Sequence, residues 1–226
     1  MKRAFASLLL SLVLGMSGAA APFKGEVYCQ SGFNGQSFFI LLTDGRVRAG
    51  LPKGGLEMFD FAKDRAENPA ITGAYASSGD KITFHFGGKA PYTWTRKRMP
   101  NGEEEMQGYM WVKEHPFTKG QTLSGVYEGG ASSGRSDNVF AFSASAYVFR
   151  PDGTFSLASG AVTSGSAASS GASSRAAGKY YCDGFTLTVT DQSGAVSRHT
   201  ACNHYKPANP AAPATIVIDG RLFTRR

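Results

Sequence analysis

The sequence has no long apolar run, which limits how the protein can meet a membrane. No segment approaches the roughly 20 apolar residues that a membrane-spanning helix requires. The apolar run from Leu8 to Met16 is shorter, follows a basic start and precedes three alanines. This order is typical of a secretory signal peptide cleaved between Ala21 and Pro22. We therefore predict a signal peptide over residues 1–21 and a periplasmic or secreted mature protein without a membrane span.

Charge is also scarce. Charged residues make up 18% of the chain, and loss of Lys2 and Arg3 with the signal peptide lowers the formal net charge from +7 to +5. The only tight basic clusters are residues 96–98 and 225–226. Because a nucleic-acid-binding protein gathers its positive charge into a patch or stripe, we expect no nucleic-acid partner. Weak attraction to an anionic cell surface is the expected consequence of the excess charge.

The motifs of familiar enzymes are absent. The chain has no His-Glu-x-x-His pair and no phosphate-binding glycine loop. Its 28 glycines are placed as turn residues instead. The sequence therefore predicts no catalytic residues and no cofactor, and a hydrolase would need a site of unfamiliar form.

What the chain does contain is a set of short alternating strands. In KITFHF, Ile82, Phe84 and Phe86 share one face, and the same period of two recurs in FTLTVT at 185–190. Such alternation is typical of antiparallel strands with one buried face. Asp-Gly pairs, which favour hairpin turns, follow or precede these runs at 44–45, 152–153 and 183–184. We therefore predict an all-β protein.

One pattern occurs twice. The stretch TGAYASSGDKITFHF at 72–86 corresponds to AGKYYCDGFTLTVTD at 177–191, with a constant offset of 105 positions. Two further blocks match in the same order: 39–50 with 147–159, and 23–28 with 123–129. Three ordered matches indicate an internal duplication, and chance similarity between β-hairpins is the alternative.

The duplication predicts the domain organisation. The first repeat spans residues 22–122 and the second 123–226, and we expect the two meanders to form one pseudo-symmetric barrel or sandwich; two small domains are the alternative. Residues 56–67 could form at most one short helix. The Ser/Gly/Ala-rich tract at 159–177 has the composition of a flexible loop.

The end of the chain carries a resemblance. The stretch GKYYCDGFTLTVTDQSGAVSRHT, together with IVIDGRLFTRR, resembles a segment of uncharacterised secreted bacterial β proteins. The whole arrangement is similar, more loosely, to calycin or lipocalin-like barrels, with GEVY and GVYE in place of their Gly-x-Trp. These resemblances imply a β fold and export, and no particular activity.

Three cysteines remain in the mature chain. In an exported protein a disulfide is expected, and we favour Cys182–Cys202, with Cys29 paired to one of them as the alternative. The stretch RHTACNH also holds His199, Cys202 and His204, whose side chains could bind zinc or copper. Because the spacing matches no familiar metal motif, these three are candidates only and no metal site is predicted.

Aromatic side chains are the remaining functional signal. Tyr92 and Trp94 share one strand face, as do Tyr109 and Trp111. Such pairs can bind a sugar or line an apolar pocket, and packing in the core is the alternative.

These features predict an exported binding or structural module of the bacterial cell envelope. Its expected partner is a small apolar or sugar ligand, or another protein. A secreted inhibitor or protein-interaction module using the rim loops is the alternative, and a hydrolase is a further one. A ligand-binding barrel would have a cavity beneath Trp94 or Trp111, whereas an interaction module would have a filled interior.

Overall fold

The computed structural model describes residues 23–32, 35–100, 103–136, 139–164 and 169–226; the predicted signal peptide lies outside them. The described chain is all-β with one short helix, α1 (Phe61–Glu67), as the sequence predicted. The strands of the first half are β1 (Gly25–Gly32), β2 (Gly35–Leu42), β3 (Arg46–Ala49), β4 (Thr72–Ser78), β5 (Lys81–Phe86), β6 (Tyr92–Arg98), β7 (Glu104–Met106) and β8 (Tyr109–Lys113). Those of the second half are β9 (Gly125–Ser136), β10 (Val139–Phe149), β11 (Thr154–Ser164), β12 (Ser169–Asp183), β13 (Thr186–Asp191), β14 (Val196–Asn203), β15 (Thr215–Ile218) and β16 (Arg221–Arg225).

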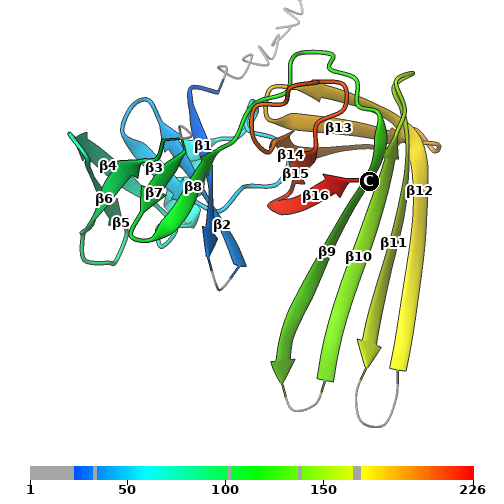
Figure 1. The fold of residues 1–226 in the computed structure, drawn as a ribbon, viewed down its shortest axis with the longest axis horizontal. Helices are drawn as coiled ribbons and strands as arrows, with labels where there is room; N and C mark the ends of the chain where they lie inside the picture. Colours follow the sequence, from blue (N-terminus) through cyan, green and yellow to red (C-terminus); the bar gives the residue numbers. More distant parts are fainter. Residues whose placement is uncertain (1–22, 33–34, 101–102, 137–138, 165–168) are drawn as a thin grey trace, which may run out of the picture.

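Each repeat closes into its own antiparallel barrel (Figure 1). In the first barrel, consecutive strands pair and β8 returns to pair with β1; in the second, β16 returns to pair with β9. The all-β class and the two antiparallel meander repeats are therefore confirmed, but the repeats form two barrels, the alternative to the single barrel or sandwich that was favoured. The physical reason is that eight strands are enough to close a barrel that side chains can fill.

The internal repeat is present at the level of single hydrogen bonds. The Tyr75 hydroxyl donates to the carbonyl of Leu42 (3.0 Å), and the Tyr180 hydroxyl donates to the carbonyl of Arg150 (3.0 Å). Each acceptor precedes its Asp-Gly turn by two residues. The second tyrosine has a further role, because its hydroxyl accepts from the Leu123 N–H (2.6 Å) and shares its one proton between the carbonyls of Arg150 and Leu123 (2.9 Å to Leu123).

We expect Tyr180→Phe to destabilise the second barrel by about 1–3 kcal/mol, because it leaves the buried backbone groups of Leu123 without their partner. The matching Tyr75→Phe change should cost less, since that hydroxyl makes one bond. Urea unfolding monitored by circular dichroism measures both. Equal losses would contradict the special role of Tyr180.

The paired glycines of the repeat also share a physical reason. A Cβ added at Gly73 would lie 2.0 Å from the carbonyl oxygen of His85, and one at Gly178 would lie 2.0 Å from that of Thr190. Both contacts are with the backbone of the next strand, which cannot move aside as a side chain could. Only glycine therefore allows this close strand pairing at either position.

The tract at 159–177, predicted as a flexible loop, is mostly strand. It belongs to β11 and β12, which pair from Thr154↔Lys179 to Ser164↔Ser169, and residues 165–168 lie outside the described chain. Figure 1 shows β9 to β12 running far beyond the rest of the second barrel as a four-stranded sheet. The composition was misleading because backbone ladder bonds, to β10 and β12 for the β11 part and to β11 for the β12 part, outweigh the weak strand propensity of Ser, Gly and Ala.

The two barrels have separate interiors and a shared apolar contact. The first interior is strongly aromatic: Tyr28, Phe39, Phe84, Phe86 and Trp111 are buried there. The second contains Tyr127, Tyr147, Phe149, Phe155 and Tyr180 among others. A third cluster joins outward-facing residues of both barrels: Val27, Cys29, Phe38, Ile40 and Val112 of the first, and Phe185, Cys202 and Val217 of the second.

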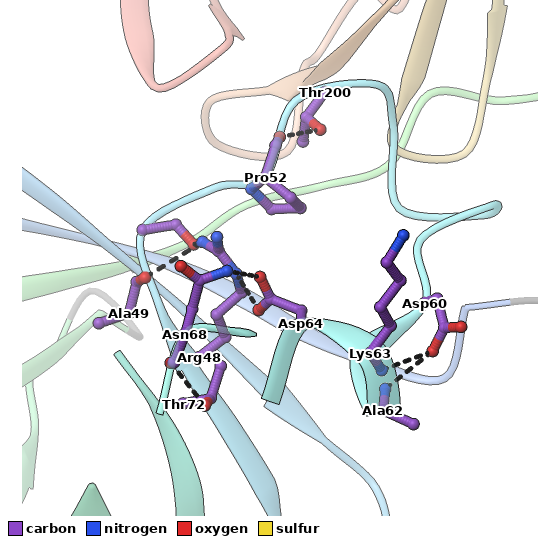
Figure 2. A network of polar contacts seen from close by, with 11 residues as sticks. Arg48, Ala49, Pro52, Asp60, Ala62, Lys63, Asp64, Asn68, Thr72 and Thr200 are labelled. Atoms are coloured by element: carbon purple, nitrogen blue, oxygen red, sulfur yellow. Dashed lines mark hydrogen bonds and ion pairs between the residues drawn. The ribbon is translucent and has the colours of Figure 1, made fainter. Parts of the chain in front are cut away.

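The segment between β3 and β4 adds polar contacts, shown in Figure 2. Asp60 caps α1 by accepting hydrogen bonds from the N–H groups of Ala62 and Lys63. Asp64 of the helix forms a buried ion pair with Arg48 of β3 (2.8 Å). Further along the segment, the Thr200 hydroxyl of β14 donates to the Pro52 carbonyl (2.5 Å). The segment is therefore fixed to both barrels.

Candidate functional site

The open end of the first barrel is the candidate functional site. Side chains alternate along its strands, so the residues that register with buried Tyr28 and Trp111 also point inward. Across neighbouring strands, Tyr28 is paired with Lys113 and Trp111 is paired with Glu104. Glu104 is in turn paired with Arg98. The inward face thus changes from aromatic in the middle of the barrel to charged at this end.

These residues line a cavity of about 400 Å³. From the first barrel come Glu26, Tyr28, Arg96, Arg98, Glu103, Glu104, Trp111, Val112 and Lys113; His115 follows β8, and Tyr205 and Lys206 follow β14. The second barrel therefore contributes one side of the cavity. Barrel mouths are a common position for small-molecule sites.

Several charges of the cavity already have partners. Lys113 forms an ion pair and hydrogen bond with Glu26, which also accepts from the Tyr28 hydroxyl (2.8 Å). Burial raises the pKa of Glu26, but the hydrogen bonds and positive charges around it prevail and hold that pKa below its usual value. Arg96 lies 3.8 Å from Glu104. Glu26 and Lys113 therefore form the fixed, ionised wall of the cavity.

Two polar atoms beside this wall have no partner in the described protein. The indole Nε1 of Trp111 and the carboxylate Oε2 of Glu104 are both buried and make no hydrogen bond there. They come from register partners on β8 and β7, and both residues line the cavity. A donor and an acceptor buried without partners carry a free-energy cost that a bound ligand can remove.

The cavity also carries an excess of positive charge. Arg98 and Lys206 are exposed at its edge and form no ion pair within the described chain. Burial, followed by the charges of Lys113 and Lys206, lowers the pKa of His115 and favours its neutral form. The unpaired cations make the cavity suitable for an anionic ligand.

The four aromatic residues singled out from the sequence are divided by the structure. Trp94 and Trp111 meet edge to face in the first barrel (5.5 Å between ring centroids), and Tyr92 packs on Trp94 (5.2 Å). Tyr109 lies near the β7–β8 turn and is 39% exposed. Three of the four thus belong to the packed interior, and Trp111 alone of the four also lines the cavity at the mouth.

The cysteines are all free thiols in the structure. Cys182 lies in the interior cluster of the second barrel, whereas Cys202 lies in the cluster between the barrels, so the expected Cys182–Cys202 bridge is not formed. The reason is that Ala201 turns inward on β14 and its neighbour Cys202 therefore turns outward. Burial raises the pKa of Cys182 and of Cys29, which also lies near Glu114, to about 12.

The three candidate metal ligands are also divided. His199 contacts Asp219 (2.7 Å from Nδ1 to Oδ2), while Cys202 and His204 both contact Glu114. Glu114 was not singled out by the sequence, because it lies 88 and 90 residues from its two contacts. The only sequence signal for it is an acidic residue directly after a strand.

His199 has one further contact. Its Nε2 lies 3.3 Å from the Ser197 hydroxyl, so Ser197, His199 and Asp219 follow the order of a nucleophile, a base and an orienting carboxylate. Residues two apart on one strand face always lie near each other. The Ser197–His199 contact is therefore explained by strand geometry, and it carries no argument for hydrolysis.

Comparisons with known proteins add no identification: no family model, no curated protein and no solved structure matches this chain. The fold-level part of the sequence resemblance, an antiparallel β-barrel, is present twice. Among the described residues, no helix has the length and apolar character needed to cross a membrane.

Proposed function

We propose that this protein is an exported binding module of the bacterial cell envelope, and that its ligand is a small acidic sugar held in the mouth of the first barrel. The observation that carries the proposal is a pair of buried, unpartnered atoms, Trp111 Nε1 and Glu104 Oε2, which belong to two residues that line one cavity. Because buried polar atoms are almost always hydrogen-bonded in proteins, an adjacent donor and acceptor without partners favour a polar ligand.

The chemistry of the ligand follows from the other side chains of the cavity. Arg98 and Lys206 favour a carboxylate, because their charges are not balanced by ion pairs in the described chain. Tyr205, 48% exposed at the edge, offers aromatic surface on which a sugar ring can pack. Hydroxyl groups of a sugar can accept from the indole N–H and donate to the Glu104 carboxylate.

The side chains at the mouth of the first barrel favour a sugar over the small apolar ligand that was also expected from the sequence. The interior beneath Trp111 is occupied by aromatic rings, with Phe39 stacked on it at 4.8 Å and Phe84 behind at 6.4 Å. The space available to a ligand is therefore the charged mouth, where an apolar molecule would remove water from ion pairs without replacing their hydrogen bonds.

Titration with glucuronic acid, followed by the fluorescence of the two tryptophans, tests the proposal. We expect saturable binding, and we expect glucose, which lacks the carboxylate, to bind at least about tenfold more weakly. Arg98→Gln should weaken glucuronic acid binding by about 2 kcal/mol, a roughly 30-fold change, while affecting glucose little. Glu104→Gln should weaken both sugars, since it changes an acceptor for hydroxyl groups.

The matched control is Arg65→Gln, an exposed arginine of α1 outside the cavity lining, which should leave binding unchanged. No binding of either sugar, or equal losses for Arg98→Gln and Arg65→Gln, would refute a ligand site of this kind. The function would then have to be sought in protein partners of the rim loops.

A further inference from the structure

A second group of polar side chains lies between the barrels, apart from the sugar site. Cys29, Glu114, Cys202 and His204 are 0%, 1%, 0% and 9% exposed. Cys29 lies on the outer wall of the first barrel, where it registers with Val112, and Cys202 lies on the outer wall of the second, where it registers with Val217. Cys29 and Cys202 pack there among apolar side chains of both walls.

The backbone brings Glu114 and His204 together. Their neighbours, His115 and Asn203, form an isolated antiparallel bridge with two hydrogen bonds of 2.9 Å. The N–H of Glu114 donates to the carbonyl of Val27 (2.8 Å), which ties this segment to β1 and places it near Cys29. The chain turns directly after His204, at Tyr205, whose φ of 65° is left-handed. Each side chain of the group is therefore positioned by regular backbone contacts.

The donor atoms of the group converge on Glu114. Its Oε1 lies 2.7 Å from His204 Nδ1, and its Oε2 lies 3.6 Å from Cys202 Sγ. The ligand atoms of Cys29, Glu114 and His204 all lie within 4.8 Å of one another. Donor atoms around a tetrahedral zinc ion at 2.0–2.3 Å lie about 3.3–3.8 Å apart. Shifts of about 1 Å therefore suffice to bring the donors of Cys29, Glu114 and His204 to zinc-binding distances, and Cys202 is already beside Glu114.

We infer that Cys29, Glu114, Cys202 and His204 form a zinc site that links the two barrels. Two sulfurs, one imidazole nitrogen and one carboxylate oxygen make a four-coordinate set that suits Zn²⁺. On binding, both thiols lose their protons to solvent and coordinate as thiolates, with His204 neutral and Glu114 ionised.

Burial supports this inference over a purely structural network. A carboxylate in an apolar contact between two domains is costly unless a positive charge or several hydrogen bonds compensate it. Among the residues that the structure describes, the Glu114 carboxylate has only His204 and a weakly donating thiol as partners. A divalent cation supplies the missing positive charge and uses the two thiols at the same time.

The site would act as a clamp. Cys29 lies on β1 and Glu114 directly follows β8 of the first barrel, whereas Cys202 lies on β14 and His204 directly follows β14 of the second barrel. One ion would thus connect segments that are up to 175 residues apart in the sequence and fix the barrels relative to each other. Its place is near the sugar site, because His204 packs on Tyr205 (4.3 Å between ring centroids) and Tyr205 lines that cavity.

Cobalt titration of the reduced, mature protein tests the inference. Co²⁺ replaces Zn²⁺ in tetrahedral sites and reports thiolate ligands by a near-ultraviolet charge-transfer band, and tetrahedral geometry by intense visible bands. We expect one equivalent of Co²⁺ to give both, and one equivalent of Zn²⁺ to abolish them. Cys29→Ser and Cys202→Ser should each remove about half of the charge-transfer intensity and weaken binding on the order of a hundredfold.

Cys182→Ala is the matched control, because this buried cysteine lies inside the second barrel and outside the group. It should leave the cobalt spectrum unchanged. His204→Gln and Glu114→Gln, which keep size and hydrogen bonding, cover the case in which a cysteine variant fails to fold; both should weaken Co²⁺ binding with an unchanged circular dichroism spectrum.

Three results would overturn the inference. The first is that the folded, reduced protein does not bind Co²⁺ stoichiometrically. The second is that Cys29→Ser and Cys202→Ser leave the cobalt spectrum intact. The third is that protein isolated from the periplasm is metal-free, has a Cys29–Cys202 disulfide and binds no metal after reduction. The zinc site and the sugar site are tested by different measurements, cobalt spectra and glucuronic acid titration. Either proposal can therefore fail while the other holds.

Discussion

Replacing Trp111 by alanine is expected to lower the free energy of unfolding by about 3–5 kcal/mol, the cost typical of deleting a large buried aromatic side chain. The indole is 1% exposed and lies at the centre of the first barrel. It stacks on Phe39 at 4.8 Å and contacts Trp94 at 5.5 Å and Tyr28 at 5.6 Å between ring centroids. These rings come from different strands, so the cavity left by alanine cannot be filled by one neighbour alone.

Trp111→Phe separates packing from hydrogen bonding. Because the indole Nε1 has no partner in the described protein, its loss should cost little, and we expect the phenylalanine variant to lose less than about 2 kcal/mol. The same variant should weaken glucuronic acid binding, since it removes the donor at the floor of the site. Urea unfolding by circular dichroism gives the stabilities, and Trp94 remains as the fluorescence reporter. A loss below about 1 kcal/mol for alanine would contradict a tightly packed barrel interior.

Asp64→Ala is expected to lower the free energy of unfolding by about 3–5 kcal/mol, because it leaves a buried guanidinium without its carboxylate. Arg48 and Asp64 are 9% and 7% exposed, and they are joined at 2.8 Å. The second oxygen of Asp64 accepts from the Asn68 amide (2.9 Å), so the change also removes a bond that holds the end of α1 (Figure 2). The segment between β3 and β4 should therefore loosen.

The same helix provides the control. Lys63 and Glu67 form an exposed pair at 3.8 Å, and Glu67→Gln should change the stability by less than about 0.5 kcal/mol. A double variant, Arg48→Met with Asp64→Leu, removes both charges together and should lie within about 2 kcal/mol of the wild type. Urea unfolding compares the three. If the single and double variants were equally unstable, the ion pair itself would not explain the loss.

Much of the fold follows from local sequence patterns. The alternation of Ile82, Phe84 and Phe86 predicts a strand with one buried face, and all three are buried in β5. The Asp-Gly turns and the matched Gly-x-Tyr segments predict the repeat, and both tyrosines bond to the turn that their repeat contains. Such features are readable because each depends on residues close together in the chain.

The predictions that failed depend on distant contacts. Whether the two repeats share one barrel or form two depends on which distant strands pair with β1 and β9. Local sequence patterns do not determine this pairing. The Ser/Gly/Ala tract has the composition of a loop, yet its two halves pair with each other as β11 and β12. The sequence could not point to Glu114 and Cys29 for the same reason, since both are far in sequence from His199, Cys202 and His204.

The sequence by itself determined the strand class, the duplication, the turn positions and the aromatic character of the first repeat, because side-chain alternation and glycine conformation act between near neighbours. Only the tertiary structure decided that there are two barrels, that charged residues from several strands meet at one mouth, and that Cys29, Glu114, Cys202 and His204 converge between the walls. The physical reason is barrel closure. Once each meander closes into a barrel, every strand has an inner and an outer face, and apolar outer faces are buried only when the two barrels pack against each other.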